Sequence, residues 1–272
     1  MIKLIAFDLD GTILDDEKRL PEENLSALKE AAEKGVVIVP STGRIFTGVP
    51  EVIRALPFVR YYITCNGASV YDAVEKTSIY RSEIEPELAV RVCRHMDTLD
   101  VIYDCYQDDW GWIDRAFYEK AADYIPNRGI YELLLRSRTP VDDLKATLTA
   151  RGRGVQKMQM HFRDMEARRR EIEEFPRLFP ELLATSSIPT NIEINSPAAH
   201  KGSALLGLCR CLGLERSECA AFGDGTNDLT MLRDAGLGIA MANAEPEVKA
   251  AADRITLSNN DCGVAKAIRE LL

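Results

Sequence analysis

The chain has 272 residues, enough for one large domain or for two unequal ones. Hydrophobic residues make up 46% and charged residues 28%, which is typical of a folded globular protein and argues against disorder. The formal net charge of −9 argues against nucleic acid as a partner, because nucleic-acid binding depends on neutralising backbone phosphates. An acidic enzyme acting on an anion must therefore supply positive charge locally, through a metal or a few basic side chains.

The cysteines and the hydrophobic segments predict the compartment. Seven cysteines, an odd number without the spacing of a disulfide framework, indicate reduced, buried thiols. The first motif begins within eight residues of Met1, which leaves no room for a signal peptide, and no apolar run approaches the length of a membrane span. We expect a soluble, cytoplasmic protein without a membrane partner, either a monomer or a dimer.

Short strands and helices alternate at the start of the chain. Apolar, largely β-branched or aromatic segments predict buried parallel strands at residues 2–7, 36–39 and 61–64. Between them we expect helices at 21–34, which begins at a proline and ends before Gly35, and at 45–56. This alternation predicts a parallel sheet covered by helices on both faces.

The middle of the chain has a different pattern. Polar residues interrupt the expected strands at 101–106, 110–113 and 156–162, and helices are expected at 85–99, 141–150 and 165–175. Alternation of this kind predicts an antiparallel sheet with one open face and one helix-covered face. We therefore predict an inserted α+β cap at residues 83–189.

The C-terminal part returns to the first pattern. Helices are expected at 202–212, 228–235 and 261–272, and strands at 218–222, 237–241 and 254–257. The sequence thus predicts an α/β protein whose doubly wound, Rossmann-like parallel sheet is formed by residues 1–82 and 190–272.

The first motif, residues 7–12, places Asp8 and Asp10 directly after a buried strand. Open α/β sheets bind ligands at the carboxyl ends of their strands, and two acids so close together favour a nearby cation. An Asp-Gly turn after a strand explains the same fragment equally well.

The second motif, residues 41–44, follows the strand at 36–39. The hydroxyl of Thr42 and the free backbone N–H groups at that position are suited to holding phosphoryl oxygens. An ordinary helix N-cap is the alternative.

Lys201 lies at the start of a helix, where the helix dipole disfavours a cation. Its position therefore suggests a role toward the carboxylate pair rather than in helix stability. Its neighbour His200 is expected to cap the helix or lie at the surface rather than act as a base.

The last motif, residues 221–228, places Asp224 and Asp228 after another strand. Carboxylates gathered at strand ends suit magnesium, although Asp228 alone could be a helix cap. A dinucleotide-binding interpretation of Gly223 and Gly225 is weak, because Asp228 occupies the third glycine position and would repel a pyrophosphate.

Taken together and in this order, DLDGTIL, STGR, HKGSAL and GDGTNDLTML resemble the motifs of the haloacid dehalogenase superfamily, and within it the Cof-type subfamily IIB. The resemblance covers the whole chain, including a cap between the second and third motifs. The chain departs from the family pattern at Ser41, where a small apolar residue is usual, and we expect no loss of function from this difference.

The resemblance implies a role for each motif residue. Asp8 would be the nucleophile, and Asp10 would protonate the leaving oxygen and then activate water. Magnesium would be bound by Asp8, Asp10 through its backbone carbonyl, and Asp224, with support from Asp228. The phosphate-binding residues implied by the resemblance are Leu9, Thr42, Gly43, Arg44, Lys201 and Asn227, of which Thr42 and Lys201 hold the transferring group.

We therefore expect a magnesium-dependent phosphatase that acts on a small phosphate ester, such as a sugar phosphate, through an aspartyl-phosphate. A phosphotransferase such as a sugar phosphomutase on the same core is an alternative that the sequence leaves open. A silent binding protein is a third hypothesis, disfavoured because every acid, hydroxyl and lysine position is retained.

Overall fold

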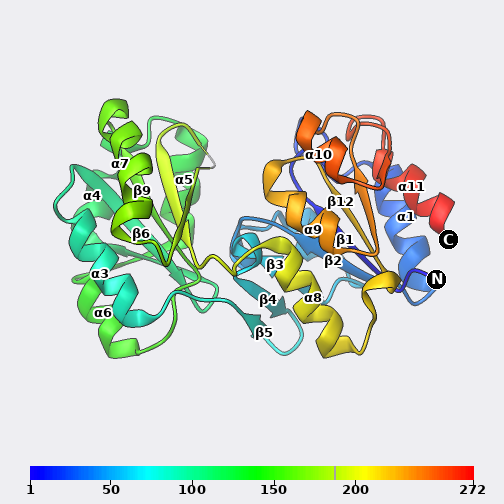
Figure 1. Cartoon of the computed structure of the whole chain (residues 1–272), viewed down its shortest axis with the longest axis horizontal. Helices are drawn as coiled ribbons and strands as arrows, with labels where there is room; N and C mark the ends of the chain where they lie inside the picture. The colour runs from blue at the N-terminus through cyan, green and yellow to red at the C-terminus, as the bar shows by residue number, and fades with distance from the viewer. Residues whose placement is uncertain (187) are drawn as a thin grey trace. The chain divides into compact units, whose positions relative to one another are not determined.

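The computed structural model describes residues 1–186 and 188–272 and divides into two units. Met1–Arg81 together with Ala199–Leu272 form the core unit, and Ser82–Ala198 form the inserted unit (Figure 1). The sequence placed the second boundary between residues 189 and 190. The structure places it later, because the strand at Asn191–Asn195 pairs within the sheet of the inserted unit.

The core unit contains an eight-stranded sheet in the order β14-β13-β12-β1-β2-β3-β4-β5. Its strands are β1 (Leu4–Asp8), β2 (Val37–Ser41), β3 (Tyr61–Thr64), β4 (Ser69–Asp72), β5 (Thr77–Arg81), β12 (Cys219–Gly223), β13 (Leu237–Ala240) and β14 (Arg254–Ile255). The strands from β14 to β3 are parallel, and β4 and β5 extend the sheet as antiparallel strands. The central strand β1 is wholly buried, as its apolar sequence requires.

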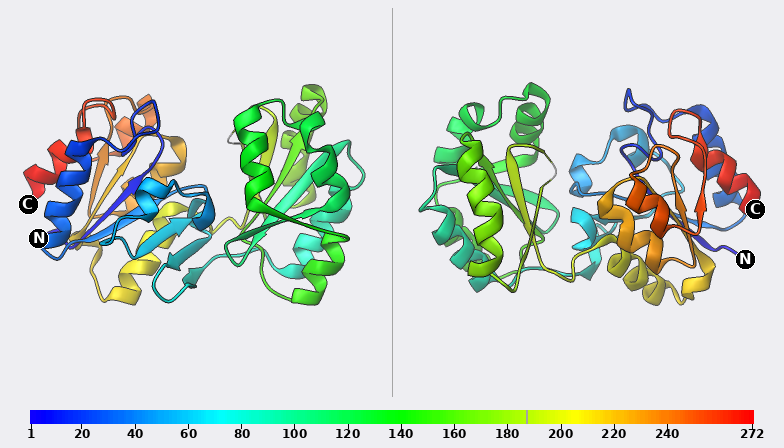
Figure 2. Two further views of the ribbon diagram at one scale, coloured as in Figure 1. Left: turned by 180° about the vertical axis from the view of Figure 1, so that it is seen from behind. Right: turned by 45° about the horizontal axis from the view of Figure 1, so that its top comes forward.

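Helices cover both faces of this sheet, which confirms the expected doubly wound fold (Figures 1 and 2). They are α1 (Glu22–Glu33), α2 (Glu51–Arg54), α8 (Lys201–Leu212), α9 (Leu229–Asp234), α10 (Pro246–Ala251) and α11 (Gly263–Leu271). The single 3₁₀ turns of the unit are η1 (Phe46–Gly48), η2 (Cys65–Gly67), η3 (Arg216–Glu218) and η4 (Thr226–Asp228). Helices α1 and α11 pack together on one face, and α8 and α9 pack together on the other.

The expected helix at 45–56 is wrong. The segment contains only the 3₁₀ turn η1 and the single turn α2, separated by Val49 and Pro50 in extended conformations. A proline disfavours helical geometry in the residue before it and is itself tolerated only at a helix start, so the helical pattern is broken there.

The inserted unit has a six-stranded sheet in the order β10-β11-β9-β6-β7-β8. Its strands are β6 (Val101–Gln107), β7 (Trp110–Asp114), β8 (Arg138–Val141), β9 (Lys157–Phe162), β10 (Leu183–Thr185) and β11 (Asn191–Asn195). Its helices are α3 (Pro86–Met96), α4 (Arg115–Tyr124), α5 (Arg128–Ser137), α6 (Leu144–Arg151) and α7 (Met165–Leu178). Every strand pair is antiparallel except β7 with β8 among the described residues.

Both faces of the inserted sheet bear buried side chains, whereas the sequence predicted one open face. Val101 and Cys105 pack into a hydrophobic cluster with α3, α6 and α7. On the opposite face, Ile102 and Ile113 pack against α4 and α5, two helices that the sequence did not predict. The remainder of that face holds buried polar groups, among them an ion pair between Arg138 and Asp104.

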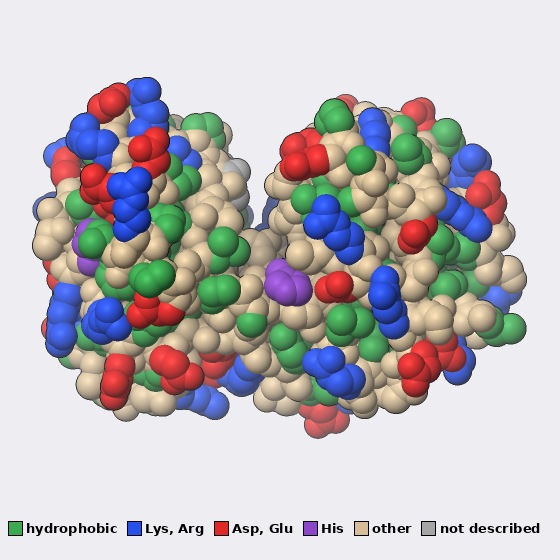
Figure 3. All heavy atoms as spheres, viewed as in Figure 1, with side chains coloured by type: hydrophobic (Ala, Val, Ile, Leu, Met, Phe, Trp, Pro, Cys, Tyr) green, Lys and Arg blue, Asp and Glu red, His purple; other side chains and the backbone are tan. Residues whose placement is uncertain are grey.

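No helix among the described residues is both long enough and apolar enough to cross a membrane. On the face shown in Figure 3, Lys and Arg side chains are interspersed with Asp and Glu.

Candidate active site

Three parallel strands of the core unit end together and bring separate motifs to one edge of the sheet. In the register of the sheet, Asp8 at the end of β1 pairs with Ser41 at the end of β2, and Phe7 pairs with Phe222 of β12. Residues that follow these strands must therefore lie near one another. This geometry assembles the site from motifs far apart in the sequence.

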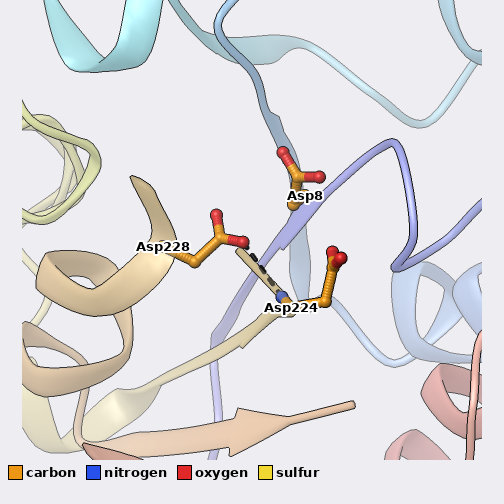
Figure 4. A group of neighbouring side chains, drawn as sticks. All are labelled: Asp8, Asp224 and Asp228. Atoms are coloured by element: carbon orange, nitrogen blue, oxygen red, sulfur yellow. Dashed lines mark hydrogen bonds between the residues drawn. The ribbon is translucent and has the colours of Figure 1, made fainter. Parts of the chain in front are cut away.

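Asp8, Asp224 and Asp228 form a carboxylate cluster (Figure 4). One oxygen from each lies within 4.8 Å of those from the other two. Asp228 is fully buried, and its Oδ2 accepts hydrogen bonds of 3.0 Å from the backbone N–H groups of Asp224 and Gly225. Asp228 therefore fixes the loop that carries Asp224, in addition to contributing charge.

Lys201 is the buried counter-charge of this carboxylate cluster. Its Nζ lies 2.5 Å from Asp8 Oδ1 and 2.6 Å from Asp228 Oδ1, and its side chain is fully buried. Burial alone would lower the pKa of this lysine, but Asp228 and Asp8 raise it above its ordinary value. The ammonium is thus held in its charged form between the two carboxylates.

His200 caps the helix α8, which begins at Lys201. It is the N-cap, and its Nδ1 accepts a 3.0 Å hydrogen bond from the backbone N–H of Ser203. The hydroxyl of Ser203 in turn donates to the His200 carbonyl at 2.8 Å. The expectation that His200 caps the helix is confirmed.

The carboxylate cluster carries more negative than positive charge. Three carboxylates face one ammonium, and burial, reinforced by Asp228 and Asp224 against the opposing effect of Lys201, raises the pKa of Asp8 to about 7. Burial also raises the pKa of Asp224. Hard oxygen donors with excess negative charge are what a divalent cation such as Mg²⁺ requires, so the donor set fits that ion.

Asp10 lies outside the carboxylate cluster. Its Oδ2 accepts a 2.6 Å hydrogen bond from Arg44 Nη2, and its Oδ1 lies 2.9 Å from Lys18 Nζ. Burial raises the pKa of this carboxyl, but Arg44 and Lys18 more than offset the effect and lower it overall. The two aspartates of the first motif therefore occupy different electrostatic environments.

The loops after β2 and β3 form a further part of the site. The backbone N–H of Thr42 donates to Ile63 at 2.9 Å, and Thr42 Oγ1 accepts a 3.3 Å hydrogen bond from the Arg44 N–H. A Cβ added to Gly43 would lie 2.8 Å from Asn66 Oδ1, which also accepts a 3.5 Å hydrogen bond from Asn227 Nδ2. Asn66 thus joins the second motif to the last one.

Leu9 differs from the other predicted phosphate-binding residues. Its side chain is fully buried in the hydrophobic core. Only its backbone is therefore available to a ligand.

Thr12, Lys18 and Asn66 also contact the site, although none of them is among the predicted site residues. Thr12 Oγ1 donates to Asp224 Oδ1 at 2.7 Å, and it lies within the first motif, so its position was a usable signal. Asn66 precedes Gly67 directly after a strand, which is a typical loop signal. Nothing in the pattern around Lys18 distinguishes it from a solvated charge.

A doubly wound sheet whose central strand ends in a buried aspartate, paired with a buried lysine and two further aspartates, fits an α/β enzyme that acts on phosphoryl groups. The comparisons with known proteins make the assignment specific. The model of the haloacid dehalogenase-like hydrolase family matches residues 5–268, and the chain belongs to this family. The family assignment from the motifs is confirmed, and the protein is a phosphatase of this family.

The sequence similarity to known proteins extends over nearly the whole chain. It is 33% identical to a 5-amino-6-(5-phospho-D-ribitylamino)uracil phosphatase of Bacillus subtilis, over 98% of this chain and 95% of the relative. It is 30% identical to an HMP-PP phosphatase of Klebsiella pneumoniae, over 92% and 88% respectively. A haloacid dehalogenase-like hydrolase from Bacteroides thetaiotaomicron has the same fold, with a TM-score of 0.83, 26% identity and full coverage of both chains.

Proposed function

We propose that the protein is a magnesium-dependent phosphatase that hydrolyses a small phosphorylated metabolite through an aspartyl-phosphate at Asp8. The observation that carries the proposal is the buried contact between Lys201 and Asp8. Because Lys201 holds Asp8 Oδ1 at 2.5 Å, the carboxylate is oriented and its second oxygen is left to act as the nucleophile.

The chain's own groups account for both halves of the reaction. Asp8 attacks phosphorus and the bond to the leaving oxygen breaks. Asp10, which must first take up a proton against the lowering of its pKa by Arg44 and Lys18, transfers that proton to the leaving oxygen. Asp10 then removes a proton from water, which attacks the aspartyl-phosphate, releases inorganic phosphate and regenerates Asp8. Thr42, Lys201 and Asn227 would hold the phosphoryl oxygens during both steps.

Asp8 and Asp224 would hold the magnesium ion, with the backbone carbonyl of Asp10 as a further ligand. Asp228 would support these ligands, since both of its oxygens already have partners within the protein. When bound, the ion would neutralise the charge of the phosphoryl group.

The substrate class follows from the relatives. Their names specify a phosphoribitylaminouracil and HMP-PP as the compounds that they act on, which supports a small organic phosphate here. We infer that the inserted unit selects the leaving group, as caps do in phosphatases that bury their substrate.

The test is release of inorganic phosphate from a panel of phosphorylated metabolites that includes the phosphoribitylaminouracil and several sugar phosphates. We expect turnover that EDTA abolishes and Mg²⁺ restores, and no turnover for Asp8→Asn. Asp123→Asn, which changes an exposed carboxylate of α4, is the matched control and should retain full activity. Full activity in metal-free buffer, or in Asp8→Asn, would overturn the proposal.

A further inference from the structure

Lys18 contacts the proposed acid and base of the reaction although it belongs to none of the motifs. We propose that Lys18 is a positioning residue. Its ammonium acts with the Arg44 guanidinium to hold the Asp10 carboxylate in the orientation from which Asp10 carries out its proton transfers. This inference rests on the function proposed above.

Each oxygen of the Asp10 carboxylate lies next to a different cation. Lys18 Nζ lies 2.9 Å from Oδ1, as an ion pair without hydrogen-bond geometry, and Arg44 Nη2 donates a 2.6 Å hydrogen bond to Oδ2. A carboxylate held by one cation can still rotate about that contact, whereas cations on both oxygens fix the plane of the group. Arg44 alone therefore does not fix the plane of Asp10.

The backbone of Lys18 has a left-handed conformation within a tight turn. Its φ is +61°, in the left-handed region that glycine and asparagine normally occupy. It lies in a tight turn closed by a 2.9 Å hydrogen bond from its own N–H to Asp15 and a 3.0 Å bond from the Asp15 N–H to Arg19. Lys76 has a similar φ outside the site, so the backbone conformation does not by itself assign a role to the Lys18 side chain, which is indicated instead by its contact with Asp10.

The turn is fixed at its base as well as at its tip. Ile13 and Leu14 are fully buried in the core, and their backbone N–H groups donate to Asp8 and Leu9. The carboxylate of Asp16 accepts hydrogen bonds from Asn259 and Asn260 near the C-terminal end of the chain. The Lys18 ammonium thus extends toward Asp10 from an anchored loop.

Stability does not account for the contact either. The Lys18 side chain is 59% exposed, and exposed ion pairs contribute little to folding. The charge is better explained by its effect on Asp10, which lies two residues from the nucleophile. The expected consequence is a change in kcat rather than in KM.

The experiment compares Lys18→Gly with Lys76→Gly in the full-length chain, with Mg²⁺ and the best substrate of the panel. Lys76 is a matched control, because it is also an exposed lysine of the core unit with a positive φ, of +54°, but lies between β4 and β5 outside the site. Both variants should keep or raise Tm, since glycine suits both turns. We expect kcat to fall about 10-fold or more in Lys18→Gly, with KM within about 2-fold, and both constants to be unchanged in Lys76→Gly.

A conservative variant and the alternative outcomes complete the test. Lys18→Arg keeps a cation at the same place and should recover most of the lost kcat. Unchanged kcat in Lys18→Gly would overturn the inference while the proposed function stands. A rise in KM alone would also overturn it, because that result would make Lys18 a substrate contact. A wild-type protein that releases no phosphate would overturn both.

Discussion

His161, on β9 of the inserted unit, is a buried imidazole without a hydrogen-bond partner among the described residues. Its Nε2 lies 3.9 Å from Asp104 Oδ2, and Arg138, Lys157 and Glu193 are the other charged groups that act on it. Burial lowers its pKa to about 4, with Asp104 opposing and Arg138 reinforcing the shift. Protonation of His161 is thus far more favourable in the unfolded chain than in the folded one.

This difference predicts a pH-dependent stability of the inserted unit. Between pH 6.5 and about 4, the unfolded chain binds a proton that the folded chain excludes, so stability falls as pH falls. From pH 7 to pH 5 the loss due to His161 should be about 2 kcal/mol. We expect His161→Gln to remove this part of the pH dependence.

Urea unfolding at pH 7 and pH 5, followed by tryptophan fluorescence, measures the effect. The two tryptophans of the chain, Trp110 and Trp112, both belong to the inserted unit and therefore report its unfolding specifically. Between pH 7 and pH 5 the wild type should lose about 2 kcal/mol more unfolding free energy than His161→Gln. The same loss in both proteins would contradict the prediction.

At the residue scale, the sequence was informative where a residue follows a buried strand or starts a helix. Asp8, Asp224 and Lys201 could be predicted because strand ends converge at one edge of the sheet, and the structure brings them together. Lys18 could not, because its contact with Asp10 depends on the conformation of a charged turn. The separation of Asp10 from the carboxylate cluster likewise depends on partners that pattern alone does not reveal.

At the scale of secondary-structure elements, the turn η2 and the helix α8 approach each other so closely that a side chain at Gly67 would overlap the start of the helix. Gly67 has φ +97°, and a Cβ there would overlap the His200 carbonyl and lie 2.7 Å from the Lys201 nitrogen. Gly35 after α1 has a similar φ of +84°, but open space where its Cβ would be. Comparing substitutions at Gly35 and Gly67 therefore separates the effect of backbone strain, which both share, from that of steric overlap, which only Gly67 has.

We expect Gly35→Ala to lower the free energy of unfolding by about 1 kcal/mol and Gly67→Ala to lower it by about 2–4 kcal/mol. The second loss is larger because only the methyl group at residue 67 also forces the start of α8 to move. Since α8 begins at Lys201, Gly67→Ala should also reduce kcat, whereas Gly35→Ala should not. Thermal unfolding by circular dichroism and steady-state kinetics measure the two effects. Equal costs in the two variants would show that the loop adapts to the added methyl group.

At the element scale, strong local patterns predicted their structures and weak ones did not. The helix α1 was recoverable because Pro21 marks its start and Gly35 follows its end. The strands β4 and β5 were missed because polar residues obscure the expected pattern, and β5 is only partly buried. The strand β11 was assigned to the wrong unit, because its pairing with β9 is not encoded near it in the sequence.

At the scale of the whole molecule, the carboxylate cluster and Lys201 all belong to the core unit. The inserted unit has hydrophobic clusters of its own. We therefore predict that residues 82–198 fold when expressed alone, with a cooperative tryptophan-detected unfolding transition and no phosphate release. A non-cooperative transition would contradict the independence of this unit.

The complementary chain, in which a short linker replaces residues 82–198, should retain weak activity on a small activated phosphate ester but lose discrimination among metabolites. The reason is that the carboxylate cluster and Lys201 lie within the core unit, whereas the proposed selection of the leaving group belongs to the inserted unit. The measurement is the ratio of kcat/KM values across the substrate panel. A soluble linker chain with the full-length selectivity would place specificity in the core loops.

The pairing of β1 with β12 has a consequence for how the chain is made. Leu4 pairs with Cys219, so the centre of the core sheet cannot close until the whole inserted unit has been synthesised. The inserted unit contains all of its own strands and can fold first. Until β12 is made, one edge of β1 keeps its backbone N–H and C=O groups unpaired. We therefore expect a chain interrupted before β12 to carry a folded inserted unit and an aggregation-prone strand but no catalytic site.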